Sequence, residues 1–128
     1  MSALQASAPN KAFVRIAGRA LVGRTIEGLR GTPRIGRIVV VAPAGSHGDP
    51  ALAGADERRD DGARMTDSLR SGLRGAPADE LLAIVASDLP ILSAAAVDDF
   101  LDRAESSGAD VVYACVERRT HASRFPEV

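Results

Sequence analysis

Asp88 is the residue whose type and position most strongly indicate chemistry. It follows an apolar run at residues 81–86 (LLAIVA), and Pro90 comes two positions later. In parallel α/β sheets, ligands bind beyond the carboxyl ends of the strands. A carboxylate at such an end suits Mg²⁺, which takes one or two carboxylates and completes its octahedron with substrate phosphates. The position also suits an aspartate that only shapes a strand-to-helix turn through its own hydrogen bonds.

Lys11 is the second candidate. It is the only lysine in the chain, and it precedes an extended segment at residues 12–16 and a turn at residues 17–19. A compact ammonium charge can bind phosphate oxygens. The alternative is a solvated surface lysine.

The segment at residues 62–68 (GARMTDS) is the third candidate, because it precedes a run with helical spacing. Free backbone amides at a helix start, together with Arg64, Thr66 and Ser68, could contact a base or a phosphate. The segment is equally typical of an ordinary helix start in which Thr66 or Asp67 is the N-cap.

Other reactive residue types form no recognisable site. His47 and His121 have no partner at the spacing of a metal motif, and no nucleophile elbow, Walker loop or dinucleotide-binding glycine motif is present. Cys115 has apolar neighbours, which predicts an inert core residue. Residues 56–61 (DERRDD) carry charges of both signs, which predicts a solvated patch.

Continuous apolar runs predict the strands that would position these side chains. Such runs, without polar alternation, are typical of strands buried on both faces of a parallel sheet. They occupy residues 37–43, 81–86 and 110–116, and residues 12–16 form a shorter extended piece.

Helical spacing fills the intervals between these runs. We expect helices over residues 21–29, ended by Gly31, over the stretch that contains Met65, Leu69 and Leu73, and from an N-cap at Ser93 to a stop at Gly108. Strands alternating with helices predict an α/β fold with a mostly parallel sheet. Residues 44–62 are predicted to be either a mobile loop that covers a site or loose surface chain.

Composition narrows the function classes. With 128 residues and 13.3 kDa, we expect a single domain over residues 1–128. A net charge of −1 and 3% aromatic residues argue against nucleic-acid binding. One cysteine excludes an internal disulfide. No apolar run reaches the roughly 20 residues of a membrane span, and residues 1–5 lack signal-peptide character, which predicts a cytoplasmic protein.

Four segments resemble the NTP-transferase superfamily, which includes MobA-like and sugar-nucleotide pyrophosphorylase-like nucleotidyltransferases. Residues 10–22 (NKAFVRIAGRALV) resemble its PKALxPVAGRPLL segment, and residues 37–43 resemble its second strand. Residues 81–90 resemble its vxGDxPL strand and metal motif, and residues 93–116 resemble the helix and GADVVYxxV strand that follow. The similarity is collinear from about Pro9 to Pro126.

The resemblance implies a Rossmann-like three-layer α/β/α sandwich of the nucleotide-diphospho-sugar transferase type. It also implies Mg²⁺-dependent transfer of a nucleoside monophosphate from an NTP to a phosphorylated sugar, alcohol or cofactor, with release of pyrophosphate. By this analogy, Lys11 and Asp88 are the catalytic residues: Lys11 binds the phosphates and Asp88 holds Mg²⁺.

The same analogy places Arg64, Thr66 and Ser68 beside the nucleotide. The implied partners are an NTP and a small phosphorylated acceptor, with neither nucleic acid nor membrane, and a homo-oligomer is left open.

The chain also departs from the family pattern. The family begins with a glycine-rich loop, roughly LAGGxGxRM, whereas residues 1–9 contain no glycine. A second metal-binding aspartate and the acceptor-binding part come later in the family. We therefore expect an incomplete copy of the fold. The alternatives to catalysis are a non-catalytic nucleotide-binding or interaction module and a truncated remnant of such an enzyme.

Overall fold

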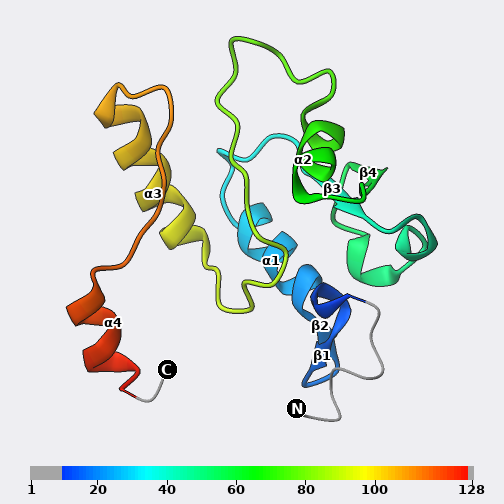
Figure 1. Cartoon of the computed structure of the whole chain (residues 1–128), viewed down its shortest axis with the longest axis horizontal. Coiled ribbons are helices and arrows are strands. Elements are labelled where there is room, and N and C mark those ends of the chain that lie inside the picture. Colours follow the sequence, from blue (N-terminus) through cyan, green and yellow to red (C-terminus); the bar gives the residue numbers. More distant parts are fainter. Residues whose placement is uncertain (1–9, 127–128) are drawn as a thin grey trace.

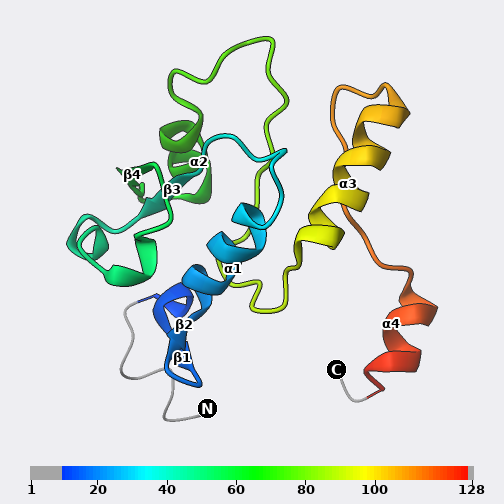
Figure 2. The same cartoon turned by 180° about the vertical axis from the view of Figure 1, so that it is seen from behind.

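The computed structural model describes residues 10–126, and Figures 1 and 2 show it from opposite sides. The strands are β1 (Arg15–Ile16), β2 (Arg19–Ala20), β3 (Val39–Ala42) and β4 (Glu57–Asp60). The helices are α1 (Leu21–Arg30), α2 (Met65–Leu73), α3 (Ala94–Ser107) and α4 (Arg118–Arg124). Three short 3₁₀ turns complete the order: η2 (Lys11–Phe13), η3 (Ala44–Ser46) and η4 (Pro50–Leu52).

A tight hairpin leads into the first helix. Strands β1 and β2 pair antiparallel, with Arg15 opposite Ala20. The turn between them has positive φ at both central residues, 51° at Ala17 and 78° at Gly18. This is the backbone twist that two-residue hairpins favour, and glycine adopts it without strain. The expected extended piece at residues 12–16 is thus divided between η2 and β1.

Helix α1 carries the core. Its buried residues, Val22, Thr25, Ile26 and Leu29, recur at the three- and four-residue spacing of one helix face. The apolar three, Val22, Ile26 and Leu29, pack in one cluster that also contains Ile38, Leu52 of η4, and Val97 and Leu101 of α3. The helix predicted over residues 21–29 is confirmed, and Gly31 is its C-cap.

Helix α3 also forms where the sequence predicts it. The hydroxyl of Ser93 accepts a hydrogen bond from the amide of Ala96, which caps the helix start. Gly108 ends the helix in the left-handed conformation, at a φ of 62°. Its buried residues, Val97, Leu101 and Ala104, recur at the spacing of one helix face.

Strands β3 and β4 form a parallel pair, with Val39 opposite Glu57 and Ala42 opposite Asp60. The strand predicted over residues 37–43 is confirmed as β3. Strand β4 lies within residues 56–61, where the sequence predicted a solvated patch, and four of these six residues are exposed. Its side chains alternate between half-buried and exposed, so one charged face of the strand is covered.

The segment at residues 44–62 is therefore ordered, contrary to the expectation of a covering loop or loose chain. Besides β4 it contains η3 and η4, and Leu52 in η4 is fully buried in the core. The guanidinium of Arg59 donates to the carbonyl oxygens of Ser71 and Arg74 at 2.7 Å each. It thereby binds the end of α2 to the β3–β4 pair.

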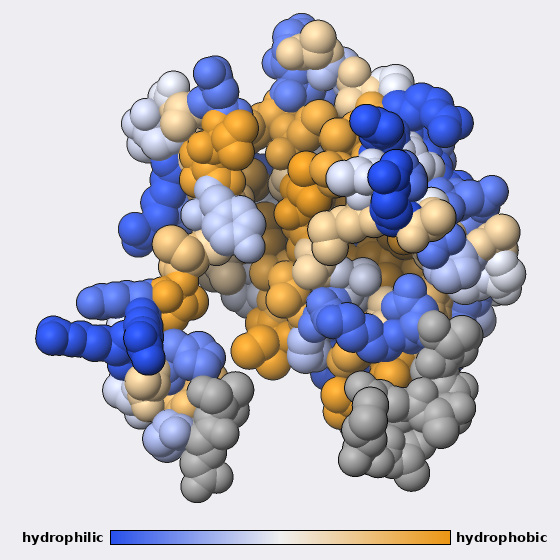
Figure 3. Space-filling model, viewed as in Figure 1, coloured by the Kyte–Doolittle hydropathy of each residue, from blue (hydrophilic) through white to orange (hydrophobic). Residues whose placement is uncertain are grey.

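Two predicted strands do not form. Residues 81–86 and 110–116 belong to no strand and are largely exposed, with Ile84 at 68% and Val111 at 83%. Neither run has a ladder partner among the described residues, and a strand needs a partner for its backbone groups. Figure 3 shows apolar side chains gathered along the middle of this face, where the chain joins α2 to α3. Cys115 lies in the second run and is exposed, so the prediction of a core residue is wrong.

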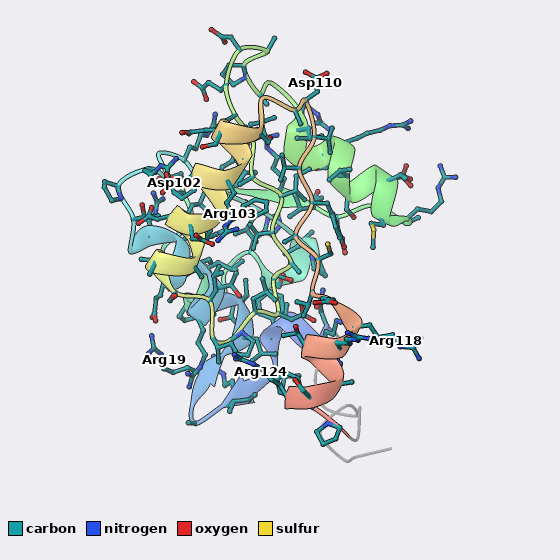
Figure 4. The ribbon with its side chains drawn as sticks, turned by 90° about the vertical axis from the view of Figure 1, so that its left-hand side faces the viewer. Arg19, Asp102, Arg103, Asp110, Arg118 and Arg124 are labelled. Atoms are coloured by element: carbon teal, nitrogen blue, oxygen red, sulfur yellow. The ribbon has the colours of Figure 1, made fainter. Side chains whose placement is uncertain are left out.

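The described residues thus form an α/β chain with one parallel strand pair, and they do not complete the expected three-layer sandwich. The segment after Asp110 leads to α4, a helix that the sequence pattern did not predict (Figure 4). Within residues 10–126, no helix has the length and apolar character that a membrane span requires. The glycine-free segment at residues 1–9 lies outside the described residues.

Candidate functional site

Lys11 is presented by the 3₁₀ turn η2. The side chain of Asn10 caps this turn by accepting from the amide of Ala12 at 3.0 Å. Ala12 is buried, at 3% exposure, and anchors the turn to the core. Because neighbouring residues of so short a turn point in different directions, burial of Ala12 leaves Lys11 outside, with its side chain 80% exposed.

Asp88 lies against Lys11. The ammonium Nζ is 2.8 Å from the carboxylate Oδ2, although the two residues are far apart in the sequence. The hydrogen bond and the positive charge of Lys11 lower the pKa of Asp88, and the carboxylate in turn raises the pKa of Lys11. Both groups therefore carry their full charge at neutral pH. The structure brings together the two side chains that the sequence predicted as catalytic.

The turn that carries Asp88 packs on α1 through Thr25, which sequence reasoning did not single out. The amide of Leu89 donates to the hydroxyl of Thr25 at 3.1 Å. Thr25 is 3% exposed and is the polar member of the buried face of α1. A polar residue at a core position of a helix was the signal that could have identified it, since buried polar groups are almost always hydrogen-bonded.

A hollow of about 590 Å³ lies beside η2. It is lined by Asn10, Phe13, Pro43, Gly45, Ser46, Gly48 and Asp49. Two of these residues flank Lys11, and the others follow the carboxyl end of β3. The volume falls within the roughly 300–1,000 Å³ of small-molecule sites.

A second hollow, of about 630 Å³, lies along β4 and beside α2. Its lining is mostly charged and polar: His47, Glu57, Arg58, Arg59, Asp60, Asp61, Gly62, Asp67, Ser71 and Arg74. The ring of His47 is held there, with Nε2 3.1 Å from the carbonyl oxygen of Ala42 and 3.5 Å from Asp60.

The predicted nucleotide-binding residues at the start of α2, Arg64, Thr66 and Ser68, line neither hollow, although Gly62 and Asp67 of the same segment line the second one. The hydroxyl of Ser68 accepts from the amide of Gly62 at 3.0 Å. Arg64 lies 3.3 Å from Asp67, and Thr66 is exposed. Arg64, and neither Thr66 nor Asp67, is the N-cap residue. Within residues 10–126, no hydrogen bond or ion pair connects this segment to Lys11 or Asp88.

The donor set around Asp88 is suited to a hydrated, phosphate-bound cation. In the part of the chain that the structure describes, no three metal-ligating side chains cluster. One carboxylate matches Mg²⁺, which dehydrates reluctantly and takes most of its ligands from water and substrate phosphates. Asp88 therefore fits the ion only when a phosphate ligand accompanies it.

A family model of known proteins matches the part of the chain that contains Lys11 and Asp88. The family model of the MobA-like NTP transferase domain matches residues 4–126, which is almost the whole chain. Neither a curated protein nor a solved structure gives a significant match. The match covers η2 with Lys11, the turn with Asp88 and all helices of the described part. The chain belongs to the MobA-like NTP transferase domain family.

Proposed function

We propose that this chain catalyses Mg²⁺-dependent transfer of a nucleoside monophosphate from an NTP to a small phosphorylated acceptor. The acceptor class is a phosphorylated sugar, alcohol or cofactor, and pyrophosphate is the second product. The observation that carries the proposal is the 2.8 Å contact between Lys11 and Asp88. The family membership supports a nucleotidyltransferase type of activity.

The reaction needs charge compensation more than covalent chemistry. An oxygen of the acceptor phosphate forms a bond to the α-phosphorus, and the bond from that phosphorus to the bridging oxygen of pyrophosphate breaks. Negative charge then increases on the departing pyrophosphate and on the α-phosphoryl oxygens. Fixed cations at those oxygens stabilise the transition state, provided that the reactants are held in line. Lys11 supplies one such charge, and Asp88 is the ligand that would hold Mg²⁺, which supplies the other.

The Lys11–Asp88 pair must open when the nucleotide binds. Since the Lys11 side chain is 80% exposed, water screens the pair and little free energy opposes its opening. The ammonium then turns to phosphate oxygens, and the carboxylate is free to bind a cation. The pair thus keeps both groups ionised and close together before substrate arrives.

The hollow beside η2 is the proposed place of the nucleotide. Asn10 and Phe13 line it on either side of Lys11 in the chain. An apolar ring next to polar side chains is typical of such pockets. Phosphates placed at Lys11 would leave the nucleoside within reach of this hollow.

Pyrophosphate release tests the proposal. The protein is incubated with each NTP, Mg²⁺ and candidate phosphorylated acceptors, and Asp88→Asn and Lys11→Met are compared with Asp99→Asn. Asp99 is an exposed α3 carboxylate paired with Arg103, so it is a matched control. We expect release by the wild type and by Asp99→Asn, and a loss of about a hundredfold or more in the other two variants. Absence of release with every pair of substrates contradicts the proposal.

A non-catalytic nucleotide-binding module is the second candidate. It is favoured by the sparse set of metal ligands, because no group of three metal-ligating side chains forms among residues 10–126. Lys11 is the only lysine, so an amine-reactive label on a side chain reports this site alone. Protection of Lys11 by NTP and Mg²⁺ without pyrophosphate release identifies binding without turnover.

A further inference from the structure

Thr25 is a buried hydroxyl at a junction between helix and turn. Its oxygen accepts from the amide of Leu89 at 3.1 Å and lies 3.2 Å from the carbonyl oxygen of Leu89. It also lies 3.4 Å from the carbonyl oxygen of Ser87 and 3.2 Å from that of Leu21. A hydroxyl has one proton and two acceptor lone pairs. Thr25 therefore donates to one of these carbonyls while it accepts from Leu89, so it contacts the residues on both sides of Asp88.

The turn around Asp88 has little other backbone support. The preceding run at residues 81–86 has no ladder partner in the described part of the chain. Between residues 77 and 92, one hydrogen bond joins backbone groups, from the amide of Leu92 to the carbonyl oxygen of Leu89. It lies within the turn and does not connect the turn to the core. The hydrogen bonds of Thr25 make that connection.

We propose that Thr25 is a positioning residue that holds the Ser87–Leu89 turn so that the Asp88 carboxylate lies against Lys11. The inference rests on the proposed function of that pair. Because α1 is the central helix of the core, the hydroxyl transfers the rigidity of the core to the turn. A valine at this position would keep the packing volume but leave the amide of Leu89 without its buried acceptor.

Thr32 offers a matched control. It is equally buried, at 2% exposure, and its hydroxyl also accepts from a backbone amide, that of Arg34, at 3.2 Å. Thr32 lies just beyond the C-terminal end of α1, donates to Asp98 at 2.5 Å and has no hydrogen bond to the Asp88 turn. Thr32→Val therefore removes a similar buried hydroxyl without affecting the proposed function of Thr25.

The experiment measures amide hydrogen exchange at Leu89 and, separately, kcat and KM for pyrophosphate release. In Thr25→Val we expect exchange at Leu89 to be about tenfold faster. We expect kcat to fall about tenfold to a hundredfold, because the carboxylate is misplaced. Thr25→Ser, which keeps the hydroxyl, should restore both values. Thr32→Val should change neither, although it lowers the urea midpoint.

The inference is overturned if the Leu89 amide of Thr25→Val exchanges its hydrogen at the wild-type rate. It is also overturned if Thr25→Ser fails to restore kcat, or if Thr32→Val lowers kcat as much as Thr25→Val does. If Thr25→Val does not fold, hydrogen exchange is measured on the wild-type protein. A Leu89 amide that is not protected from exchange overturns the inference, and a protected one supports it. If the wild type releases no pyrophosphate, the proposed function fails, and the exchange measurements still decide whether Thr25 holds the turn.

Discussion

Gly28 tests how tightly the Asp88 turn and its continuation are packed on α1. The glycine faces Leu92, four residues after Asp88 and just before the N-cap of α3. A Cβ at this position would lie 2.3 Å from the carbonyl oxygen of Leu92 and 3.0 Å from its carbonyl carbon. Both are backbone atoms, so no side-chain rotation can relieve the contact. The perturbation is the single methyl group of Gly28→Ala.

Two opposing effects set the size of the change. In a helix interior, alanine is about 1 kcal/mol more favourable than glycine, so helix propensity alone predicts stabilisation. Ordinary contact begins near 3.4 Å, so the carbonyl oxygen of Leu92 must retreat by about 1.1 Å. Overpacking of this kind typically costs about 1–3 kcal/mol, more for a backbone shift. We therefore expect Gly28→Ala to lower the free energy of unfolding by up to about 2 kcal/mol.

Gly23→Ala is the control on the same helix. Its Cβ would meet nothing closer than the carbonyl oxygen of Ala51 at 3.4 Å, which is ordinary contact. Helix propensity then dominates, and the free energy of unfolding should rise by up to about 1 kcal/mol. Urea denaturation followed by circular dichroism compares the two midpoints, which should shift in opposite directions. Equal shifts, or a stabilised Gly28→Ala, would refute the argument from packing.

Three further predictions follow from the core, a helix cap and the site. Leu52→Ala should lower the free energy of unfolding by about 2–5 kcal/mol, because the side chain is fully buried; a loss below 1 kcal/mol in urea denaturation would contradict this. Ser93→Ala should cost about 1 kcal/mol by removing the α3 cap, and Ser93→Asp should retain most of it in the same assay. The Lys11–Asp88 pair should contribute a small stabilisation that is lost as the pH falls through the lowered pKa of Asp88 or rises through the raised pKa of Lys11. The urea midpoints of wild type and Lys11→Met should therefore differ at neutral pH and converge in acid, and a constant difference across this range would argue against the pair.

Helices α1 and α3 were predictable because their determinants are local. The face of α1, the Ser93 cap and the left-handed Gly108 can be read from a few neighbouring residues. The Lys11–Asp88 contact is long-range, and it was predictable only through the family resemblance. Without the resemblance, the sequence around Lys11 was equally consistent with a surface lysine, and that around Asp88 with an aspartate that only shapes a turn.

The strands were less predictable because pairing is not a local property. The charged run of β4 forms a strand since β3 offers it a parallel edge and Arg59 binds the end of α2. The apolar runs at residues 81–86 and 110–116 have stronger strand-forming sequences but no partner in the described residues. Propensity therefore gave the wrong result in both directions, as expected when packing context decides strand formation.

This difference changes what positions Asp88. In a complete parallel sheet, a ladder on each side of the strand would fix the residue that follows it. Here the apolar run that leads to Asp88 is unpaired in the described part of the chain and largely exposed. The Asp88 carboxylate nevertheless reaches Lys11, because two positions of α1 hold this part of the chain. Thr25 binds the turn at Leu89, and Gly28 packs against Leu92, which follows the turn. The candidate site therefore depends on one helix, and substitutions on the buried face of α1 should affect it more than substitutions within residues 81–86.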